Sequence, residues 1–246
     1  MKTIALPIIL GLMTACGQQD PSPYEIDAFV TPNGKTVKFH ALAHASLRIE
    51  FDGKEIEIDP VCKQEQRVIN YSDFPKADVI IVTHDHFDHL DTAAITALTK
   101  KETKLITNQE GANHLGYGTV MVNGDRLVVN DWLTVEAVPA YNITEGHLQF
   151  HPKGRDNGYI LTLDGLRIYI AGDTEDIPEM AAIQDIDIAF LPCNQPYTMT
   201  PEQVVRVARL IKPRVLFPYH YSQTDVSVLA PQLHGDGIEV RVRHYE

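Results

Sequence analysis

The feature that most restricts this sequence is a short polar segment, Thr-His-Asp-His-Phe-Asp-His, at residues 83–89. It follows directly on residues 78–82, a largely apolar run with polar residues on both sides. Such a run is typical of a strand that is buried on both faces of a sheet. The polar segment is therefore predicted to lie on the loop that follows a buried strand.

This segment combines three imidazoles with carboxylates, and both groups are ligands for Zn²⁺ and neighbouring transition metals. One ion cannot easily use all of them. The alternating residues His84 and His86 are predicted to face one ion, whereas Asp88 and His89 face a second ion beside it. The competing interpretation is an exposed loop rich in His and Asp, which we disfavour because so dense a cluster rarely follows a buried strand.

The rest of the chain is read mainly as short strands separated by turn signals, with Asp52-Gly53 and Asp164-Gly165 as hairpin turns. Expected strands lie at residues 36–39, 46–51, 55–58, 78–82, 104–107, 119–122, 126–129, 133–138, 159–163, 166–170, 186–191 and 215–218. Expected helices lie at residues 90–100, 178–183, 201–211 and 226–233. This order suits an α+β fold in which two sheets pack face to face with helices outside, an αββα sandwich.

Residues 83–89 resemble the signature of the metallo-β-lactamase superfamily, and two later segments match in the family's order. Ala171–Thr174 is similar to the family's Gly-Asp turn, which implies that Asp173 bridges two metal ions. Pro218–Tyr221 is similar to the segment that gives the last ligand, which implies that His220 completes the second ion's site. The resemblance covers nearly the whole body of the chain and implies the αββα sandwich of the metallo-β-lactamase type.

The third ligand of the first ion is predicted between the motif and Asp173, where His147 and His151 compete. The chain resembles the subgroup of ascorbate-6-phosphate lactonase and of the phospholipase D that acts on N-acyl phosphatidylethanolamine. This resemblance favours His151 as the ligand. Lactonase-like members carry a Val-Pro-Ala-Tyr-Asn stretch, then His-Pro-Lys and a Gly-Tyr strand, as this chain does at residues 138–142, 151–153 and 158–159. His147 remains the alternative ligand, because it lies in an insertion that holds residues Glu145 to Gln149.

The resemblance implies an enzyme, a metal-dependent hydrolase with two divalent ions, most readily Zn²⁺ with Mn²⁺ or Fe as alternatives. A pair of ions makes hydroxide available at neutral pH, and this hydroxide is expected to attack a small ester, lactone or phosphodiester. Asp88 and Asp173 are the expected catalytic carboxylates. The alternatives are a catalytically silent metal-binding protein of the cell envelope and a β-lactamase-like amide hydrolase.

Other residues near the predicted site have two interpretations each. Asp59 is either the hydrogen-bond partner of a ligating His or a turn residue before Pro60. His44 is either a residue near the cavity or a structural His, and it is not counted as a ligand. Several polar and aromatic side chains either contact substrate or pack: Tyr141, Asn194, Tyr197, Tyr219 and Tyr221.

The N-terminus resembles a bacterial lipoprotein signal, because Lys2 precedes an apolar run that ends in Thr14-Ala15-Cys16. We expect residues 1–15 to be a signal peptide, residues 16–35 a lipidated tether and residues 36–246 the metallo-β-lactamase-fold domain. The protein is then lipid-anchored through Cys16 at the bacterial cell envelope. The other two cysteines, Cys62 and Cys193, either pair or remain buried thiols.

The net charge of the 246-residue chain is −12, which disfavours nucleic acid because a polyanion needs a basic face. The expected partner is a small-molecule substrate. This substrate could be anionic, because four basic residues near the predicted site could hold a single phosphate: Lys63, Arg67, Lys153 and Arg155.

Overall fold

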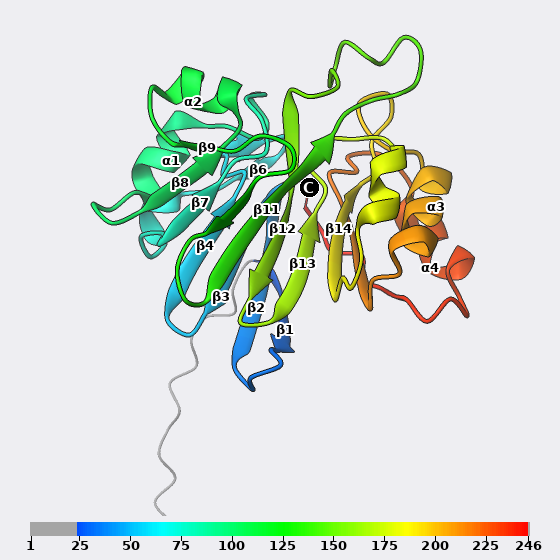
Figure 1. Cartoon of the computed structure of the whole chain (residues 1–246), viewed down its shortest axis with the longest axis horizontal. Coiled ribbons are helices and arrows are strands. Elements are labelled where there is room, and N and C mark those ends of the chain that lie inside the picture. The colour runs from blue at the N-terminus through cyan, green and yellow to red at the C-terminus, as the bar shows by residue number, and fades with distance from the viewer. Residues whose placement is uncertain (1–23, 246) are drawn as a thin grey trace, which may run out of the picture.

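Two mixed seven-stranded sheets form the centre of the fold in the computed structural model, which describes residues 24–245 (Figure 1). The first sheet has the spatial order β1 (Glu25–Val30), β2 (Thr36–Ala43), β3 (Ser46–Phe51), β4 (Lys54–Ile58), β7 (Val79–Ile81), β8 (Lys104–Thr107) and β9 (Thr119–Val120). The second has the order β10 (Arg126–Val128), β11 (Leu133–Ala140), β12 (Asp156–Leu163), β13 (Leu166–Ile170), β14 (Ile188–Pro192), β15 (Val215–Tyr219) and β16 (Glu239–Val240).

Helices cover the outer side of each sheet, which gives the αββα layers that the sequence predicts (Figure 1). Beside the first sheet lie η1 (Tyr71–Asp73), α1 (Thr92–Leu98) and α2 (Gln109–Leu115), and a small ribbon of β5 (Lys63–Gln64) and β6 (Arg67–Val68) adjoins them. Beside the second lie η2 (Pro178–Ala182), α3 (Pro201–Ile211), η3 (Val226–Val228) and α4 (Leu229–Gln232). Within residues 24–245, none of these helices has the length and apolar character that a membrane span requires.

Strand β7 shows why its sequence is a continuous apolar run. Val79 and Ile81 face the core between the two sheets, whereas Ile80 and Val82 belong to a second core under α1, where they join Ile95. All five side chains are at most 1% exposed. A strand with both faces covered needs apolar residues at consecutive positions, and this confirms the predicted buried strand before the polar segment.

The ligand-bearing segments leave both sheets at the ends of parallel strands. In the first sheet β7 runs parallel to β4, and residues 83–89 follow it. In the second sheet β13, β14 and β15 are parallel neighbours. Asp173 follows β13, and His220 follows β15. Parallel neighbours end at the same edge of a sheet, so each sheet presents its polar residues at one edge.

The folded domain begins before the predicted boundary at residue 36. Strand β1 pairs antiparallel with β2, so Glu25–Val30 belongs to the first sheet and not to a tether. The prediction failed because Asp27 interrupts the apolar pattern of this segment. In the fold Asp27 is only 7% exposed and pairs with Arg241 and Arg243, which lie 214 and 216 residues away in sequence. The predicted signal peptide and Cys16 lie outside the described residues.

The helix α2 was not predicted, because Gly111 and several polar residues weaken its helical pattern. Asn108 caps its first turn by accepting a hydrogen bond from the Gly111 N–H at 2.8 Å. A Cβ atom at Gly111 would come within 2.1 Å of the Thr107 hydroxyl. The glycine therefore allows the helix to pack closely on the end of β8.

Candidate metal centre

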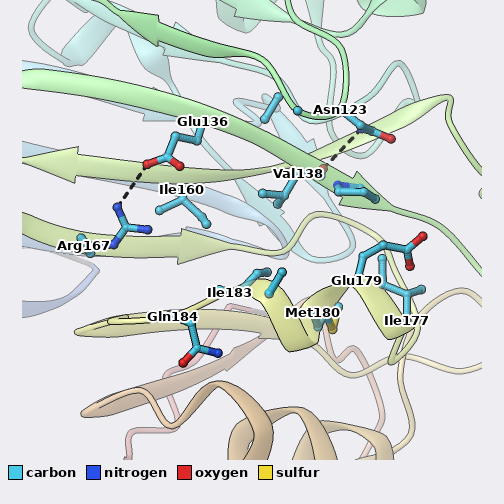
Figure 2. A pocket seen from close by; sticks show the side chains of 14 residues that line it. Asn123, Glu136, Val138, Ile160, Arg167, Ile177, Glu179, Met180, Ile183 and Gln184 are labelled. Atoms are coloured by element: carbon cyan, nitrogen blue, oxygen red, sulfur yellow. Dashed lines mark hydrogen bonds and ion pairs between the residues drawn. The ribbon is translucent and has the colours of Figure 1, made fainter.

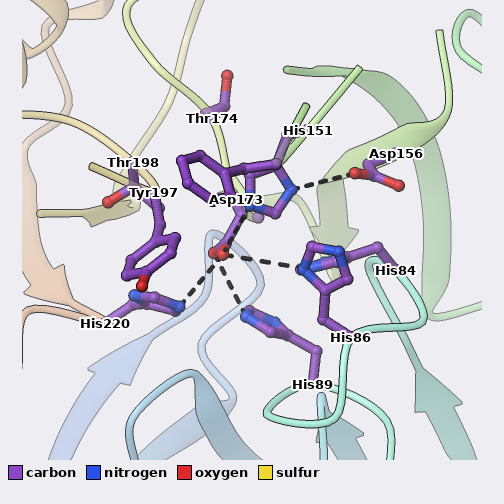
Figure 3. A network of polar contacts seen from close by, with 12 residues as sticks. His84, His86, His89, His151, Asp156, Asp173, Thr174, Tyr197, Thr198 and His220 are labelled. Atoms are coloured by element: carbon purple, nitrogen blue, oxygen red, sulfur yellow. Dashed lines mark hydrogen bonds and ion pairs between the residues drawn. The ribbon is translucent and has the colours of Figure 1, made fainter. Parts of the chain in front are cut away.

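Histidines from three separate segments converge on one carboxylate, that of Asp173 (Figure 3). Its Oδ2 atom lies 3.2 Å from Nε2 of His220 and 3.4 Å from Nε2 of His151. The same oxygen is 4.0 Å from Nε2 of His84, and Oδ1 is 3.3 Å from Nε2 of His89. Asp173 is only 3% exposed. One carboxylate therefore faces histidines from both halves of the predicted site, as a bridging ligand must.

The turn that presents Asp173 requires glycine before it. Gly172 has φ +64°, in the left-handed region that favours glycine. A Cβ atom there would lie 2.8 Å from the Asn157 carbonyl oxygen and 3.3 Å from the side chain of Thr83. In addition, the Gly172 N–H donates a 3.0 Å hydrogen bond to the hydroxyl of Tyr219. Tyr219 is therefore a structural residue of this turn.

The first ligand group consists of His84, His86 and His151, whose candidate ligand atoms all lie within 4.8 Å of one another. His151 comes from the loop between β11 and β12 and is 1% exposed. The competing residue His147 points elsewhere, since its Nδ1 lies 3.2 Å from Oε1 of the buried Glu175. The structure thus brings His151, and not His147, to the other two histidines.

The second ligand group consists of Asp88, His89 and His220, and the structure adds His44 to it. His44 Nε2 lies 3.4 Å from Asp88 Oδ2, and the His220 Nε2 lies 3.8 Å from the same oxygen. The ring centroids of His44 and His220 are 3.7 Å apart. His89 lies closer to His84 and Asp173. Of the two interpretations of His44, the structure shows the residue near the cavity. His44 lies in the β2–β3 turn with φ +52°.

Asp59 holds the orientation of His89. Its Oδ2 lies 2.8 Å from His89 Nδ1, while Thr83 donates hydrogen bonds from its backbone N–H to Oδ1 at 2.7 Å and from its hydroxyl to Oδ2 at 2.8 Å. Asp59 is fully buried. A carboxylate on the far nitrogen of a metal-ligating His fixes the tautomer and the ring orientation. Of the two interpretations of Asp59, the hydrogen-bond partner is the one that the structure shows.

Asp156 has the same relation to His151 and was missed in the sequence. Its Oδ2 lies 3.1 Å from His151 Nδ1. Arg155 donates to both oxygens of Asp156, at 2.8 and 2.7 Å, and also approaches Nε2 of His86 at 3.2 Å. The available signal was the carboxylate five residues after His151, at the start of β12.

The charges of the site favour an ionised Asp173 beside cationic imidazoles. Burial favours the neutral acid, but the charges of His220 and His89 outweigh it and hold the pKa of Asp173 well below its usual range. Burial likewise favours neutral His220, yet Asp173 outweighs this effect and raises the pKa of His220 to about 9. Without metal, protonated His220 and His89 therefore neutralise the carboxylate, whereas burial lowers the pKa values of His84 and His86. Metal cations would take the place of these protons.

The residues present fit a metal centre. The buried atoms at the site that lack a hydrogen bond to any residue in the described part of the chain include four that face one another: Nε2 of His84, Nε2 of His89, Nε2 of His220 and Oδ1 of Asp173. Buried polar atoms without hydrogen bonds are costly and rare, and these four point toward one another. Imidazole nitrogens with carboxylate oxygens are a suitable donor set for Zn²⁺ and similar ions.

A cavity of about 570 Å³ opens over the ligands. Asn194 and Tyr197 line it, as the substrate-contact interpretation of these residues requires. The other candidates face away. The Tyr141 hydroxyl donates to Glu179, and the Tyr221 hydroxyl donates to the backbone oxygen of Arg243.

A second cavity, of about 350 Å³, lies on the other side of the second sheet, where η2 covers β11–β13 (Figure 2). Its lining is mainly apolar and includes Val138, Ile160 and Met180. The ion pair of Arg167 with Glu136, 3.1 Å long, stands at its edge. It shares no lining residue with the metal cavity. Within residues 24–245, Cys62 and Cys193 are unpaired thiols, and neither lines either of these cavities.

The fold and this convergence of histidines on Asp173 define a class of protein. Residues 38–220 match the family model described as the β-lactamase superfamily domain. The chain belongs to this superfamily and, within it, to the UPF0173 metal-dependent hydrolase family. The predicted metallo-β-lactamase fold and the predicted class of enzyme, a metal-dependent hydrolase, are thereby confirmed.

Relatives in bacteria and archaea support this assignment. A UPF0173 metal-dependent hydrolase of Thermococcus kodakarensis is 32% identical over 195 residues, which are 76% of this chain and 85% of the relative. A crystal structure of a metal-dependent hydrolase from Parabacteroides distasonis has 48% identity and a TM-score of 0.88, with 91% of this chain and all of that chain covered. The metallo hydrolase Igni18 of Ignicoccus hospitalis has 27% identity and a TM-score of 0.71, with 84% and 94% covered.

Proposed function

We propose that this chain is a two-metal hydrolase, anchored at the bacterial cell envelope, that cleaves a small ester, lactone or phosphodiester. The observation that carries the proposal is the position of Asp173, whose two oxygens face histidines of both ligand groups at 3.2–4.0 Å. A carboxylate shared in this way is what a pair of adjacent ions needs.

In this proposal the first ligand group would hold one ion, the second ligand group would hold the other, and Asp173 would be a ligand available to both. Zn²⁺ is the expected ion, with Mn²⁺ or Fe as alternatives, because the donors are nitrogen and oxygen. When bound, such a pair lowers the pKa of water towards about 7 and polarises a substrate oxygen. His44 is an additional candidate contact of the second ion, because it lies 3.4 Å from Asp88.

The residues around the ligands prepare the site before any ion or substrate arrives. Asp59 accepts a hydrogen bond from the Nδ1–H group of His89. Nε2 of the same ring then faces Asp173. Asp156 does the same for His151, and Arg155 holds Asp156 by two hydrogen bonds. Rings fixed in this way lose little freedom on binding metal.

The cavity supplies neutral polar groups for the substrate. Asn194 is held by its backbone N–H, which donates to the Thr198 hydroxyl at 2.7 Å, and its side-chain amide lies 3.4 Å from the Ser222 hydroxyl. Tyr197 lines the same cavity and is 44% exposed, and it is the proposed proton donor to a leaving group. The resemblance to lactonase-like members supports a lactone within this substrate range.

The test combines metal analysis with hydrolysis of a lactone, a thioester, a phosphodiester and a β-lactam by the purified chain. Two equivalents of metal, with turnover of one substrate class that Asp173→Ala abolishes, are the expected result. A metal-free protein would overturn the ligand assignment. Two bound ions without turnover of any substrate would favour a silent metal-binding protein, and turnover of the β-lactam alone would favour amide hydrolysis.

Anchoring at the envelope is supported by the sequence at Thr14-Ala15-Cys16 and by the start of the folded domain at β1. Residues 16–24 then separate the lipidated thiol from the first strand. Mass spectrometry of the membrane-extracted protein should find an N-terminal Cys16 carrying lipid. Cys16→Ser should release the protein from the membrane fraction, and an unprocessed Met1 on the mature protein would refute the anchor.

A further inference from the structure

We infer that the substrate of this metal centre is an uncharged ester or lactone with an apolar substituent, and that Phe87 selects it. The inference rests on the proposed function and narrows it. Two observations carry it: an aromatic side chain exposed beside the ligands, and a cavity lining in which neither Lys nor Arg occurs.

Phe87 is 82% exposed, the highest value among the large apolar side chains that are exposed in the described residues. It stands in sequence between His86 and Asp88 and lines the same cavity as they do. An exposed aromatic side chain on a loop does not pack in the core and so does not stabilise the fold. Contact with an apolar group of the substrate would remove this surface from water, which favours binding.

Other aromatic residues line the same cavity. Phe150 and Tyr197 pack edge to face with ring centroids 4.9 Å apart. Asn142 ties this pair to its surroundings, because its side-chain amide donates to the Tyr197 carbonyl oxygen at 2.9 Å. Phe150 immediately precedes the ligand His151 in the chain. The cavity therefore has apolar surface next to the residues that would hold the reacting carbonyl group.

Three basic residues near the site have partners outside the cavity, although Arg155 also approaches Nε2 of the ligand His86 at 3.2 Å. Arg155 donates to Asp156, and Arg67 donates to the backbone oxygens of Leu42 and His244. Lys153 pairs with Glu179 at 2.7 Å. None of these residues lines the cavity. The fourth basic residue that the sequence offered for a phosphate, Lys63, likewise lies outside the lining. Among the described residues, the lining therefore offers no Lys or Arg to a phosphate or carboxylate on the substrate.

The charged residue in the lining that is not a proposed ligand is an acid, Asp85. An anionic substituent placed away from the ions would lose water and meet a like charge, and both effects weaken binding. Gln64, Asn194 and Ser222 offer neutral hydrogen-bonding groups instead. The lining thus suits an uncharged polar ester function with an apolar arm.

The test uses two esters of matched length, 4-nitrophenyl hexanoate and the mono-4-nitrophenyl ester of adipic acid, which ends in a carboxylate. We expect kcat/KM of the metal-loaded chain to be about tenfold or more higher for the hexanoate. Phe87→Ala should lower kcat/KM for the hexanoate about tenfold, mainly through KM. Tyr117→Ala is the matched control, since Tyr117 is an exposed aromatic residue (51%) outside the cavity, and it should change neither value.

Gln64→Lys tests the charge argument by adding a cation to the cavity lining. This variant should raise kcat/KM for the adipate ester and leave the amount of bound metal unchanged. The corresponding anilides, which resist hydrolysis, give a readout that needs no turnover. Calorimetry should show tighter binding of hexananilide than of the adipic monoanilide, and Phe87→Ala should remove this difference.

Equal or better use of the adipate ester, or no binding of either anilide to metal-loaded protein, would overturn the inference. Turnover of a phosphodiester without turnover of either ester would also overturn it, while the hydrolase assignment would stand. Failure of the proposed function looks different, since the purified chain would then either bind no metal or bind two ions and hydrolyse none of the substrate classes.

Discussion

The carboxylate of Asp59 lies 2.8 Å from Nδ1 of His89 and is itself held by two hydrogen bonds from Thr83. Asp59 adopts φ +45°, a conformation that a non-glycine residue seldom takes. The turn after β4 therefore accepts backbone strain to bring this carboxylate beneath the ligand loop. Strain of this kind is often found at functional sites.

Asp59→Asn should weaken binding of one of the two ions about 10- to 100-fold. The amide cannot accept the His89 proton and both Thr83 hydrogen bonds at once, so the ring loses its fixed tautomer. Metal occupancy measured against a competing chelator should fall toward one ion per chain. Asp52→Asn is the control, because Asp52 lies in an exposed turn and pairs with Lys35. Full occupancy in Asp59→Asn would contradict this role.

His151→Ala and His147→Ala form a matched pair that separates the two candidates for the third ligand. His151 lies 3.4 Å from Asp173, whereas His147 lies 3.2 Å from Glu175. Only His151→Ala should therefore reduce metal content and abolish turnover. His147→Ala should keep both ions. If the two variants lose metal equally, the assignment of the first ligand group is wrong.

The fold and most of the site were predictable because they depend on local patterns. The apolar strand β7 and the dense His/Asp segment after it are readable within a dozen residues. The turn at Gly172-Asp173, by contrast, was assigned from its resemblance to the family's Gly-Asp turn.

What could not be predicted depends on contacts between distant residues. Strand β1 was missed because the partners of Asp27 come from the end of the chain. His44 was left undecided because nothing in its neighbourhood shows that Asp88 and His220 close around it. Asp156 was missed because a carboxylate at a strand start is common, and its contact with His151 appears only in three dimensions.

Metal-free protein should lose stability as the pH rises from 7 to 10. The charge of Asp173 raises the pKa of buried His220 to about 9, above its ordinary value of 6.5. A raised histidine pKa contributes stability that is complete below about 6.5 and lost as the pH passes through about 9, up to about 3 kcal/mol. Urea unfolding after chelation measures this loss.

Metal-loaded protein should lose less stability between pH 7 and 10, because its imidazole nitrogens would bind metal cations in place of protons. His220→Asn serves as the control without the titrating group, and it should flatten the pH dependence of the metal-free chain. A metal-free chain whose stability rises between pH 7 and 10 would contradict the proposed pairing of His220 with Asp173.

Glu57 should destabilise the protein at neutral pH. It is fully buried, and neither carboxylate oxygen has a hydrogen bond within the described part of the chain. Arg48 lies 3.9 Å away but is bound to Glu55 by two hydrogen bonds of 2.9 Å. Burial, only partly offset by Arg48, raises the pKa of Glu57 well above its usual range. The acid therefore costs no stability below about pH 4.5. The cost grows as the pH rises above that value and is complete once the pH has passed the raised pKa of Glu57.

Glu57→Gln removes this charge and keeps the shape of the side chain. The variant should gain about 1–3 kcal/mol over the native chain at pH 9, and the gain should shrink toward pH 5, where Glu57 is protonated in the folded state. Urea unfolding at both pH values measures the difference. Glu55→Gln is the matched control, because it breaks a real ion pair with Arg48 and should lower stability at pH 9. A Glu57→Gln variant that is less stable at pH 9 would show that Arg48 stabilises the ionised Glu57 after all.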